Sequence, residues 1–317
     1  MTNTRNRRGW QRLGSALAGC LTLVAGAAVA APAASAHAGS GHQTLQAGHR
    51  GHDHERGRHH GGYLALGDSV AFGYRPPEVT PPADYLDAAN FVGYPEYLAA
   101  RRHLKVTNAS CPGETTASMI TPGAQSNGCE NSVGSPVGYR STFPLHVAYG
   151  GTQLAYAVDQ LRSNPHTRLV TINIGANDLF VCQVTTADHC TGSDFPAAVG
   201  QVEANLDTIL GTLRQQGQYH GRLVVLTYYS LDYTDAQQVG STQALDAALV
   251  RAAGANDARV ADGFAAFARA SASSGGKPCA AGLLIPLPSG GCNIHPSAKG
   301  HRVLAHAIAT ALEKEHS

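Results

Sequence analysis

Residues 63–73 read Tyr-Leu-Ala-Leu-Gly-Asp-Ser-Val-Ala-Phe-Gly, and this stretch decides the fold class. A short apolar run typical of a buried strand ends at Gly67, and Ser69 opens the next segment. Such a turn can hold the Ser69 hydroxyl at the mouth of an α/β sheet, where a substrate can reach it. Serine alone is a weak nucleophile, so this hypothesis also requires a base and an oxyanion site.

Further strands and helices alternate along the rest of the chain. Buried strands are predicted at Tyr63–Leu66, Lys105–Asn108, Leu169–Ile174 and Leu223–Tyr228, with a short fifth at Arg259–Val260. Amphipathic stretches with helical spacing cover residues 94–102, 152–163, 197–215, 242–253 and 297–313. This alternation is typical of parallel βαβ units. We therefore predict one α/β domain over residues 61–317, a three-layer α/β/α sandwich with a mostly parallel five-stranded sheet.

Four polar blocks follow these elements, and each carries a residue type with catalytic chemistry. They are Gly67-Asp68-Ser69, residues 108–116 (Asn-Ala-Ser-Cys-Pro-Gly-Glu-Thr-Thr), Gly175-Ala176-Asn177-Asp178 and Asn293-Ile294-His295-Pro296. Ligands of parallel sheets bind off the carboxyl ends of the strands, so the blocks that follow strands can meet there. In type and order the four blocks resemble the SGNH hydrolases, a branch of the GDSL esterases and lipases. The matching residues here are Ser69, Gly113, Asn177 and His295.

The resemblance covers essentially the whole predicted domain, and it implies a flavodoxin-like SGNH hydrolase fold. It also implies a serine esterase that needs neither a metal nor a cofactor, with relatives of secreted, actinobacterial type. Ser69 would attack the ester carbonyl, and His295 would take the Ser69 proton and later deliver it to the leaving alcohol. The N–H groups of Ser69 and Gly113 and the Asn177 amide would form the oxyanion hole.

Each of these residues also has a purely structural alternative. Ser69 could cap the following helix, Gly113 and Asn177 could be ordinary turn residues, and His295 could be a surface residue before a helix. We interpret the neighbouring Asp68 and Asp178 as structural residues that hold their turns through hydrogen bonds.

One position departs from the family pattern. Many relatives place an aspartate two or three residues before the histidine, where this chain has Asn293 and Cys292. We therefore predict a Ser-His dyad whose Nδ1–H is held by a backbone carbonyl, for example from the 289–292 loop. The alternative is a remote acid, Asp262 or Asp232, as the third member.

The cysteines indicate disulfides rather than a metal site. Apart from Cys20, the chain has six: Cys111, Cys129, Cys182, Cys190, Cys279 and Cys292. An even number in an exported chain is typical of disulfide bonding. Several pairings are open, and we favour the sequential one, 111–129, 182–190 and 279–292, because each bond then closes a separate loop. The spacings do not match a structural zinc site of the Cys-x-x-Cys kind.

The N-terminal region predicts export. Arginines, an apolar stretch over residues 16–31 and the small residues Ala34-Ser35-Ala36 indicate a signal peptide over residues 1–36. Residues 6–10 resemble a twin-arginine signal, and Leu17-Ala18-Gly19-Cys20 leaves lipoprotein anchoring through Cys20 as an alternative. Residues 37–60 are rich in His, Gly and Arg with little to bury, so we predict a disordered linker. Histidine-rich tracts can also bind Zn, Ni or Cu ions.

Charge and hydropathy narrow the function further. The formal net charge is +1 and no basic run lies in residues 61–317, which argues against nucleic-acid binding. No stretch there has the ~20 apolar residues of a membrane span. We predict an extracellular, monomeric esterase acting on lipid or short-chain acyl esters. The segment from Ser118 to Gly151 and the Cys182–Cys190 loop would form the rim that selects the substrate. The alternatives are a carbohydrate acetyl esterase with the same machinery and a non-catalytic metal-binding protein.

Overall fold

The computed structural model describes residues 61–313. The predicted signal peptide with Cys20 and the predicted linker over residues 37–60 lie outside these residues. Five parallel strands form the main sheet in the order β2-β1-β3-β4-β5. Their bounds are β1 Gly62–Gly67, β2 Lys105–Asn108, β3 Thr167–Asn173, β4 Arg222–Leu226 and β5 Arg259–Ala261. A separate antiparallel hairpin joins β6 Leu284–Pro286 and β7 Cys292–Pro296.

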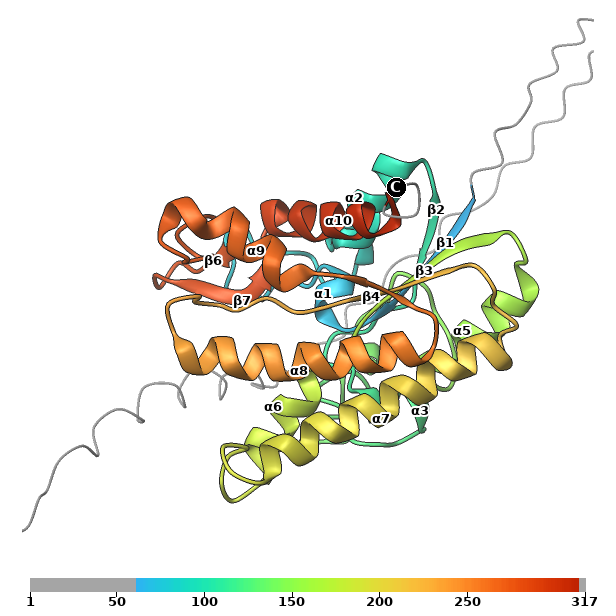
Figure 1. Ribbon diagram of the computed structural model, residues 1–317, viewed down its shortest axis with the longest axis horizontal. Coiled ribbons are helices and arrows are strands. Elements are labelled where there is room, and N and C mark those ends of the chain that lie inside the picture. Colours follow the sequence, from blue (N-terminus) through green and yellow to red (C-terminus); the bar gives the residue numbers. More distant parts are fainter. Residues whose placement is uncertain (1–60, 314–317) are drawn as a thin grey trace, which may run out of the picture. The chain divides into compact units, whose positions relative to one another are not determined.

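Helices cover both faces of the sheet (Figure 1), which makes three layers. One face carries α2 Tyr94–Arg102, α9 Gly263–Ser271 and α10 Ala298–Glu313. The other carries α5 Gln153–Ser163, α7 Asp194–Gln215 and α8 Ala236–Ala255. The remaining helices are α1 Ser69–Phe72, η1 Ala88–Asn90, α3 Thr116–Ile120, α4 Tyr139–Thr142, α6 Ala176–Thr185 and η2 Ala272–Ser274.

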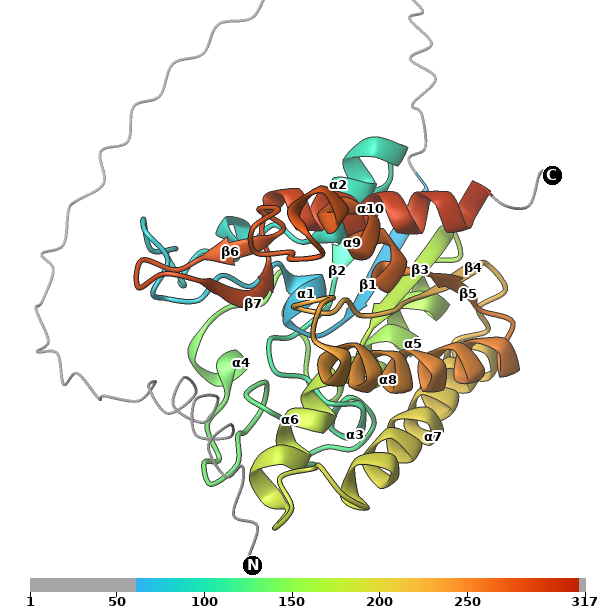
Figure 2. The same ribbon diagram turned by 60° about the vertical axis from the view of Figure 1, so that its left-hand side comes forward.

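The strand register gathers the polar blocks at one edge of the sheet. Gly67 at the end of β1 pairs with Asn173 at the end of β3, and Ala65 pairs with Asn108 at the end of β2. The segments that follow these three strands therefore leave the sheet side by side. The β6–β7 hairpin brings the fourth block to the same place, because β7 packs against α1 (Figure 2).

The predicted fold class is confirmed, and the differences from the sequence prediction are local. All five predicted helices are present, although α7 and α8 begin several residues earlier than expected. The β6–β7 hairpin was not predicted, and neither were the helices α3, α4, α6 and α9. Cys182 lies within α6, so the segment from Cys182 to Cys190 is only partly a loop. None of the helices in residues 61–313 combines the length and apolar character needed to cross a bilayer.

The buried carboxyl of Asp246 on α8 makes the stability of this fold depend on pH. Its side chain is 8% exposed; Oδ1 accepts a hydrogen bond from Tyr228 N, and Oδ2 has no partner within the described residues. Burial raises the pKa of Asp246 from 3.8 to about 8. The folded state therefore holds this proton more tightly than the unfolded state. The resulting stabilisation is full below pH 3.8 and is lost as the pH rises to about 8.

We expect Asp246→Asn to raise the free energy of unfolding by about 1–3 kcal/mol at pH 9 and to change it little at pH 5. The amide keeps the acceptor for Tyr228 N and removes a buried charge. Denaturant unfolding at both pH values measures this, with the exposed Asp159→Asn as the matched control. Equal changes at the two pH values would contradict the assignment.

Candidate active site

Ser69 is the first residue of α1, directly after the turn that joins β1 to α1, and its neighbours hold that turn rigidly. Asp68 donates its N–H to Asn173 O (3.1 Å), and Asp68 Oδ1 accepts from Val70 N (2.9 Å). Asp68 Oδ2 accepts from the Tyr228 hydroxyl at 2.5 Å. Burial raises the pKa of Asp68 to about 7. Asp68, not Ser69, is therefore the N-cap of α1, which leaves the Ser69 hydroxyl available for another role.

His295 meets Ser69 across 226 residues of sequence, with His295 Nε2 2.9 Å from Ser69 Oγ. The Tyr229 hydroxyl donates to Ile294 O (2.8 Å) and so holds the backbone beside the histidine. The Tyr74 ring lies 5.0 Å from the imidazole, centre to centre. The residue is partly exposed, and burial of its ring by these neighbours lowers the pKa of His295 to about 4. The imidazole is thus neutral, as a general base must be.

The partner of His295 Nδ1 differs from both sequence-based hypotheses. It is the side-chain oxygen Asn293 Oδ1, at 2.5 Å, rather than a backbone carbonyl of the 289–292 loop. Asp262 instead caps α9 by accepting from Ala265 N. Asp232 accepts from Thr234 and pairs with Lys277 Nζ at 3.3 Å. Asp262 and Asp232 therefore make hydrogen bonds to other groups, and the side-chain amide of Asn293 is the acceptor for His295 Nδ1.

Gly113 follows β2 in a conformation that a side chain would disturb. Its φ is +81°, and an added Cβ would lie 2.5 Å from Asn127 O. Asn127 N also donates to Gly113 O at 2.8 Å. Within residues 61–313, the Gly113 and Ser69 N–H groups have no hydrogen-bond acceptor. Both N–H groups are therefore donors that the described residues leave unpaired.

Asn177 lies in the first turn of α6 after β3 and is 6% exposed. Its Nδ2 donates to Glu114 O (3.0 Å), and its Oδ1 accepts from Asn127 Nδ2 (2.9 Å). The amide orientation is thus fixed, and one Nδ2 hydrogen is not used by this pair of contacts. Asn127 holds both Gly113 and Asn177, a role that sequence reasoning missed because no local pattern marks it. Asp178 accepts from Thr116 N and Oγ1 and ties α6 to α3.

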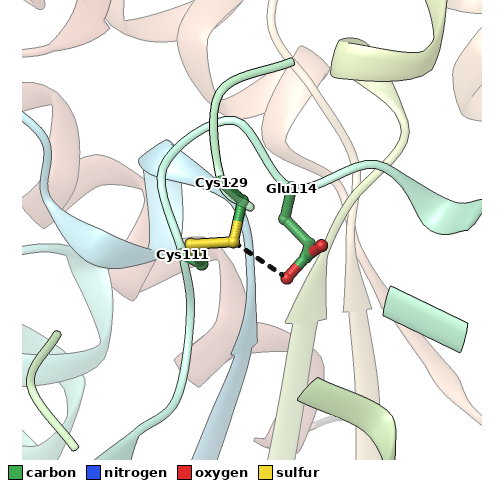
Figure 3. Close-up of side chains that lie close together, drawn as sticks. All are labelled: Cys111, Glu114 and Cys129. Atoms are coloured by element: carbon green, nitrogen blue, oxygen red, sulfur yellow. Dashed lines mark hydrogen bonds between the residues drawn. A yellow bond between two sulfur atoms is a disulfide. The ribbon is translucent and has the colours of Figure 1, made fainter. Parts of the chain in front are cut away.

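The three disulfides join Cys111 to Cys129, Cys182 to Cys190 and Cys279 to Cys292, as predicted. Figure 3 shows the first of them beside Glu114, whose Oε2 lies 3.5 Å from Cys129 Sγ. Because the two sulfurs are bonded to each other, this group is not available as a thiolate metal site. Burial raises the pKa of Glu114 to about 7.

Glu114 connects the 111–129 loop to the end of β1. Glu114 Oε2 accepts from Gln153 Nε2 (3.0 Å), and Gln153 Oε1 accepts from Gly67 N (2.6 Å). The disulfide lies two residues before Gly113 on one side and two residues after Asn127 on the other. Together these bonds hold the Gly113 turn against the Ser69 turn.

Aromatic side chains form one wall beside His295. Tyr74 N donates to Ser69 O at 2.9 Å, which places the Tyr74 ring next to the imidazole. Behind it the rings of Phe91, Tyr85 and Tyr139 lie at centre distances of 6.3, 6.0 and 6.2 Å from Tyr74. Ile294, adjacent to His295, is 37% exposed. Phe91 and Tyr139 are buried, so the apolar surface on this side of the site comes from Tyr74, Tyr85 and Ile294.

A cavity of about 770 Å³ lies at the opposite, amino-terminal edge of the sheet. Arginines line it, among them Arg168, Arg214 and Arg222, and none of the site residues above does. Arg214 donates to backbone carbonyls of Tyr219, Gly221, Asn256 and Asp257. Basic side chains at this edge complement the helix C-termini that gather there, so we interpret them as structural.

Comparison with known proteins agrees with the fold. The sequence model of the GDSL-like Lipase/Acylhydrolase family matches residues 65–303. A catalytic mutant of Axe2, an acetylxylan esterase from Geobacillus stearothermophilus, has a TM-score of 0.50 at 16% identity and covers 80% of this chain and 94% of its own. LAE5, an alpha/beta hydrolase enzyme from the metagenome of Lake Arreo, has a TM-score of 0.49 at 18% identity, with coverages of 81% and 97%. The lipase Lip_vut3 from a goat rumen metagenome has a TM-score of 0.48 at 15% identity, with coverages of 78% and 96%. No curated protein matches.

Proposed function

Because the chain belongs to the GDSL-like lipase/acylhydrolase family and is a carboxylic ester hydrolase, we propose that it cleaves apolar acyl esters through an acyl-enzyme on Ser69. The observation that carries the proposal is the 2.9 Å contact between His295 Nε2 and Ser69 Oγ at the carboxyl edge of the sheet. A neutral imidazole at hydrogen-bond distance from a hydroxyl is the arrangement that activates a serine nucleophile.

Two half-reactions follow from this arrangement. Ser69 Oγ attacks the carbonyl carbon while His295 Nε2 takes the hydroxyl proton, and His295 returns that proton to the leaving alcohol. A water molecule then attacks the acyl-enzyme with the same histidine as base. In both steps the negative oxygen is stabilised by the N–H groups of Ser69 and Gly113 and by Asn177 Nδ2. The N–H groups that the described residues leave unpaired and the fixed Asn177 amide support this assignment.

The aromatic wall supports an apolar acyl or alkyl group in the substrate. Tyr74 borders His295, and Tyr139 reaches the same cluster from the segment predicted to form the rim. Apolar surface beside the reacting bond favours chains longer than acetyl, since each added methylene that becomes buried contributes about 0.8 kcal/mol.

We further propose that the protein is exported and acts outside the cell as a monomer. Three disulfides in the described residues support an oxidising compartment. The signal peptide over residues 1–36 remains a prediction from the sequence. Mass spectrometry of protein from the culture medium tests it, and a chain that begins at His37 is the expected result.

The experiment that tests the proposed function offers the purified protein p-nitrophenyl esters from acetate to palmitate, together with acetylated xylan. We expect kcat/KM to rise by about tenfold or more from acetate to the preferred longer chain. A fluorophosphonate should inactivate the enzyme stoichiometrically and modify the peptide that contains Ser69. Faster deacetylation of xylan than of every alkyl ester would favour the carbohydrate esterase instead. No turnover and no labelling would refute the enzyme proposal and favour the metal-binding alternative.

A further inference from the structure

Asn293 makes two contacts with His295 that fix how protons are placed on the imidazole. Asn293 Oδ1 lies 3.1 Å from His295 N and 2.5 Å from His295 Nδ1. The backbone N–H can only donate, so the Asn293 atom between them must be the carbonyl oxygen of the amide. Nδ1 then carries the proton that this oxygen accepts. The other ring nitrogen, Nε2, is left with its lone pair directed at Ser69 Oγ.

The position of Asn293 is fixed by its surroundings on β7. Its neighbour Cys292 is bonded to Cys279, and the next residue, Ile294, accepts a hydrogen bond from the Tyr229 hydroxyl at its backbone oxygen. β7 itself pairs with β6, with Cys292 opposite Pro286. The amide that faces His295 is therefore held by the chain on both sides of it.

The groups that contact the His295 side chain carry no carboxylate. Tyr74 faces the ring from the end of α1, Tyr229 reaches the hairpin from the end of β4, and His301 lies on α10. Asp68, adjacent to Ser69, is engaged by Tyr228 and Val70 N. No carboxylate in residues 61–313 is hydrogen-bonded to His295. Burial alone lowers the pKa of His295, whereas a neighbouring carboxylate would raise it.

We propose that Asn293 is the positioning residue of a Ser-His-Asn arrangement, and that its neutral amide keeps the Ser69–His295 pair active at acidic pH. This proposal rests on the proposed esterase function. If Asn293 presented its NH₂ group to Nδ1, the proton of the imidazole would be on Nε2 and His295 could not accept the Ser69 proton. Here the backbone N–H of His295 donates to the amide oxygen, so the oxygen faces the ring. The amide therefore supplies orientation without the charge that would favour an imidazolium in the resting enzyme.

The test compares kcat/KM from pH 3.5 to 9 for the wild type, Asn293→Asp and Asn293→Leu on a soluble p-nitrophenyl ester. For Asn293→Asp we expect the acid limb to move up by at least about one pH unit, because the carboxylate stabilises the protonated imidazole. For Asn293→Leu we expect kcat on the plateau to fall about 10- to 100-fold with little change in KM. The downfield Nδ1–H proton resonance of His295 should be lost in Asn293→Leu.

The matched control is Asn164→Asp, which adds the same charge at the exposed end of α5, before β3 begins. Its profile should overlay that of the wild type. Thermal unfolding separates a misfolded variant from a positioning effect. Superimposed acid limbs for Asn293→Asp and the wild type, or full kcat in a folded Asn293→Leu, would overturn the inference. A wild type without any ester turnover would instead refute the proposed function.

Discussion

Replacing Ser69 with alanine is expected to lower kcat/KM for ester hydrolysis by at least about 10⁴-fold. The acyl-enzyme requires an oxygen nucleophile at this position, and the remaining groups only bind and polarise the substrate. Ser69 Oγ makes its hydrogen bond to His295, whereas Asp68 caps α1, so the substitution should leave the fold intact. Initial rates at substrate concentrations below KM measure the loss of kcat/KM. Thermal unfolding of the same variant measures whether the fold is intact.

His295→Ala should cost about as much as Ser69→Ala, and the double variant should be little worse than either, because the two residues act as one unit. Ser297→Ala is the matched control. Ser297 Oγ accepts from Lys299 N and Gly300 N at the start of α10, two residues after His295. This control should lose about 1 kcal/mol of stability and keep its activity. A fully active Ser69→Ala, or additive losses in the double variant, would contradict the proposed mechanism.

Asn177→Ala is expected to lower kcat by about 10²- to 10³-fold with little change in KM. The Asn177 amide is assigned to the negative oxygen that exists only after attack, so its loss should affect the transition state more than substrate binding. Steady-state kinetics on the preferred ester, with separate kcat and KM, measure the effect. The affinity for a trifluoromethyl ketone, which forms a tetrahedral adduct, should fall in parallel.

Asn127→Ala should change the same quantities in the same direction by a smaller factor, about tenfold. Asn127 orients Asn177 by donating from Nδ2 to Asn177 Oδ1, and it holds the Gly113 turn through its backbone N–H. Only the side-chain contact is lost in alanine, so Gly113 keeps its support. A rise in KM with unchanged kcat in Asn177→Ala would remove this residue from the oxyanion hole.

The strands and helices could be predicted from the sequence because their cause is local. The apolar run before Gly67 and those that end near Asn108 and Ile174 are short, bounded by polar blocks and separated by helical spacing. Parallel strands bring their carboxyl ends to one edge, so the three blocks that follow strands could be predicted to meet, and the family resemblance placed the His295 block with them. Helix α6 was missed because its N-cap Gly175 and its first residues, Ala176 to Asp178, have the composition of a turn.

The hydrogen-bond partners of Asn177 and His295 could not be predicted, because they depend on contacts between segments that are distant in the sequence or on the path of the backbone. Asn127 supports Asn177 from 50 positions away, and the 111–129 disulfide and Glu114 hold that loop against β1. Asn293 is only two residues from His295, yet which acceptor faces Nδ1 depends on the path of β7. That path is set by β6, by Cys279 and by the Tyr229 hydroxyl.

The sequence alone was enough to predict the α/β fold, and its resemblance to the SGNH hydrolases implied Ser69, Gly113, Asn177 and His295 as site residues, while the sequential disulfide pairing was the favoured one of several. Apolar periodicity is sufficient for the fold, since each parallel strand directs the residues after it to the same edge, whereas His295 reaches that edge through the β6–β7 hairpin, which was not predicted. The tertiary structure was needed to show that the Asn293 amide, not a carboxylate or a backbone carbonyl, accepts the Nδ1 proton of His295. Hydrogen-bond partners are chosen by side-chain positions within a few ångströms, and packing between distant segments sets those positions.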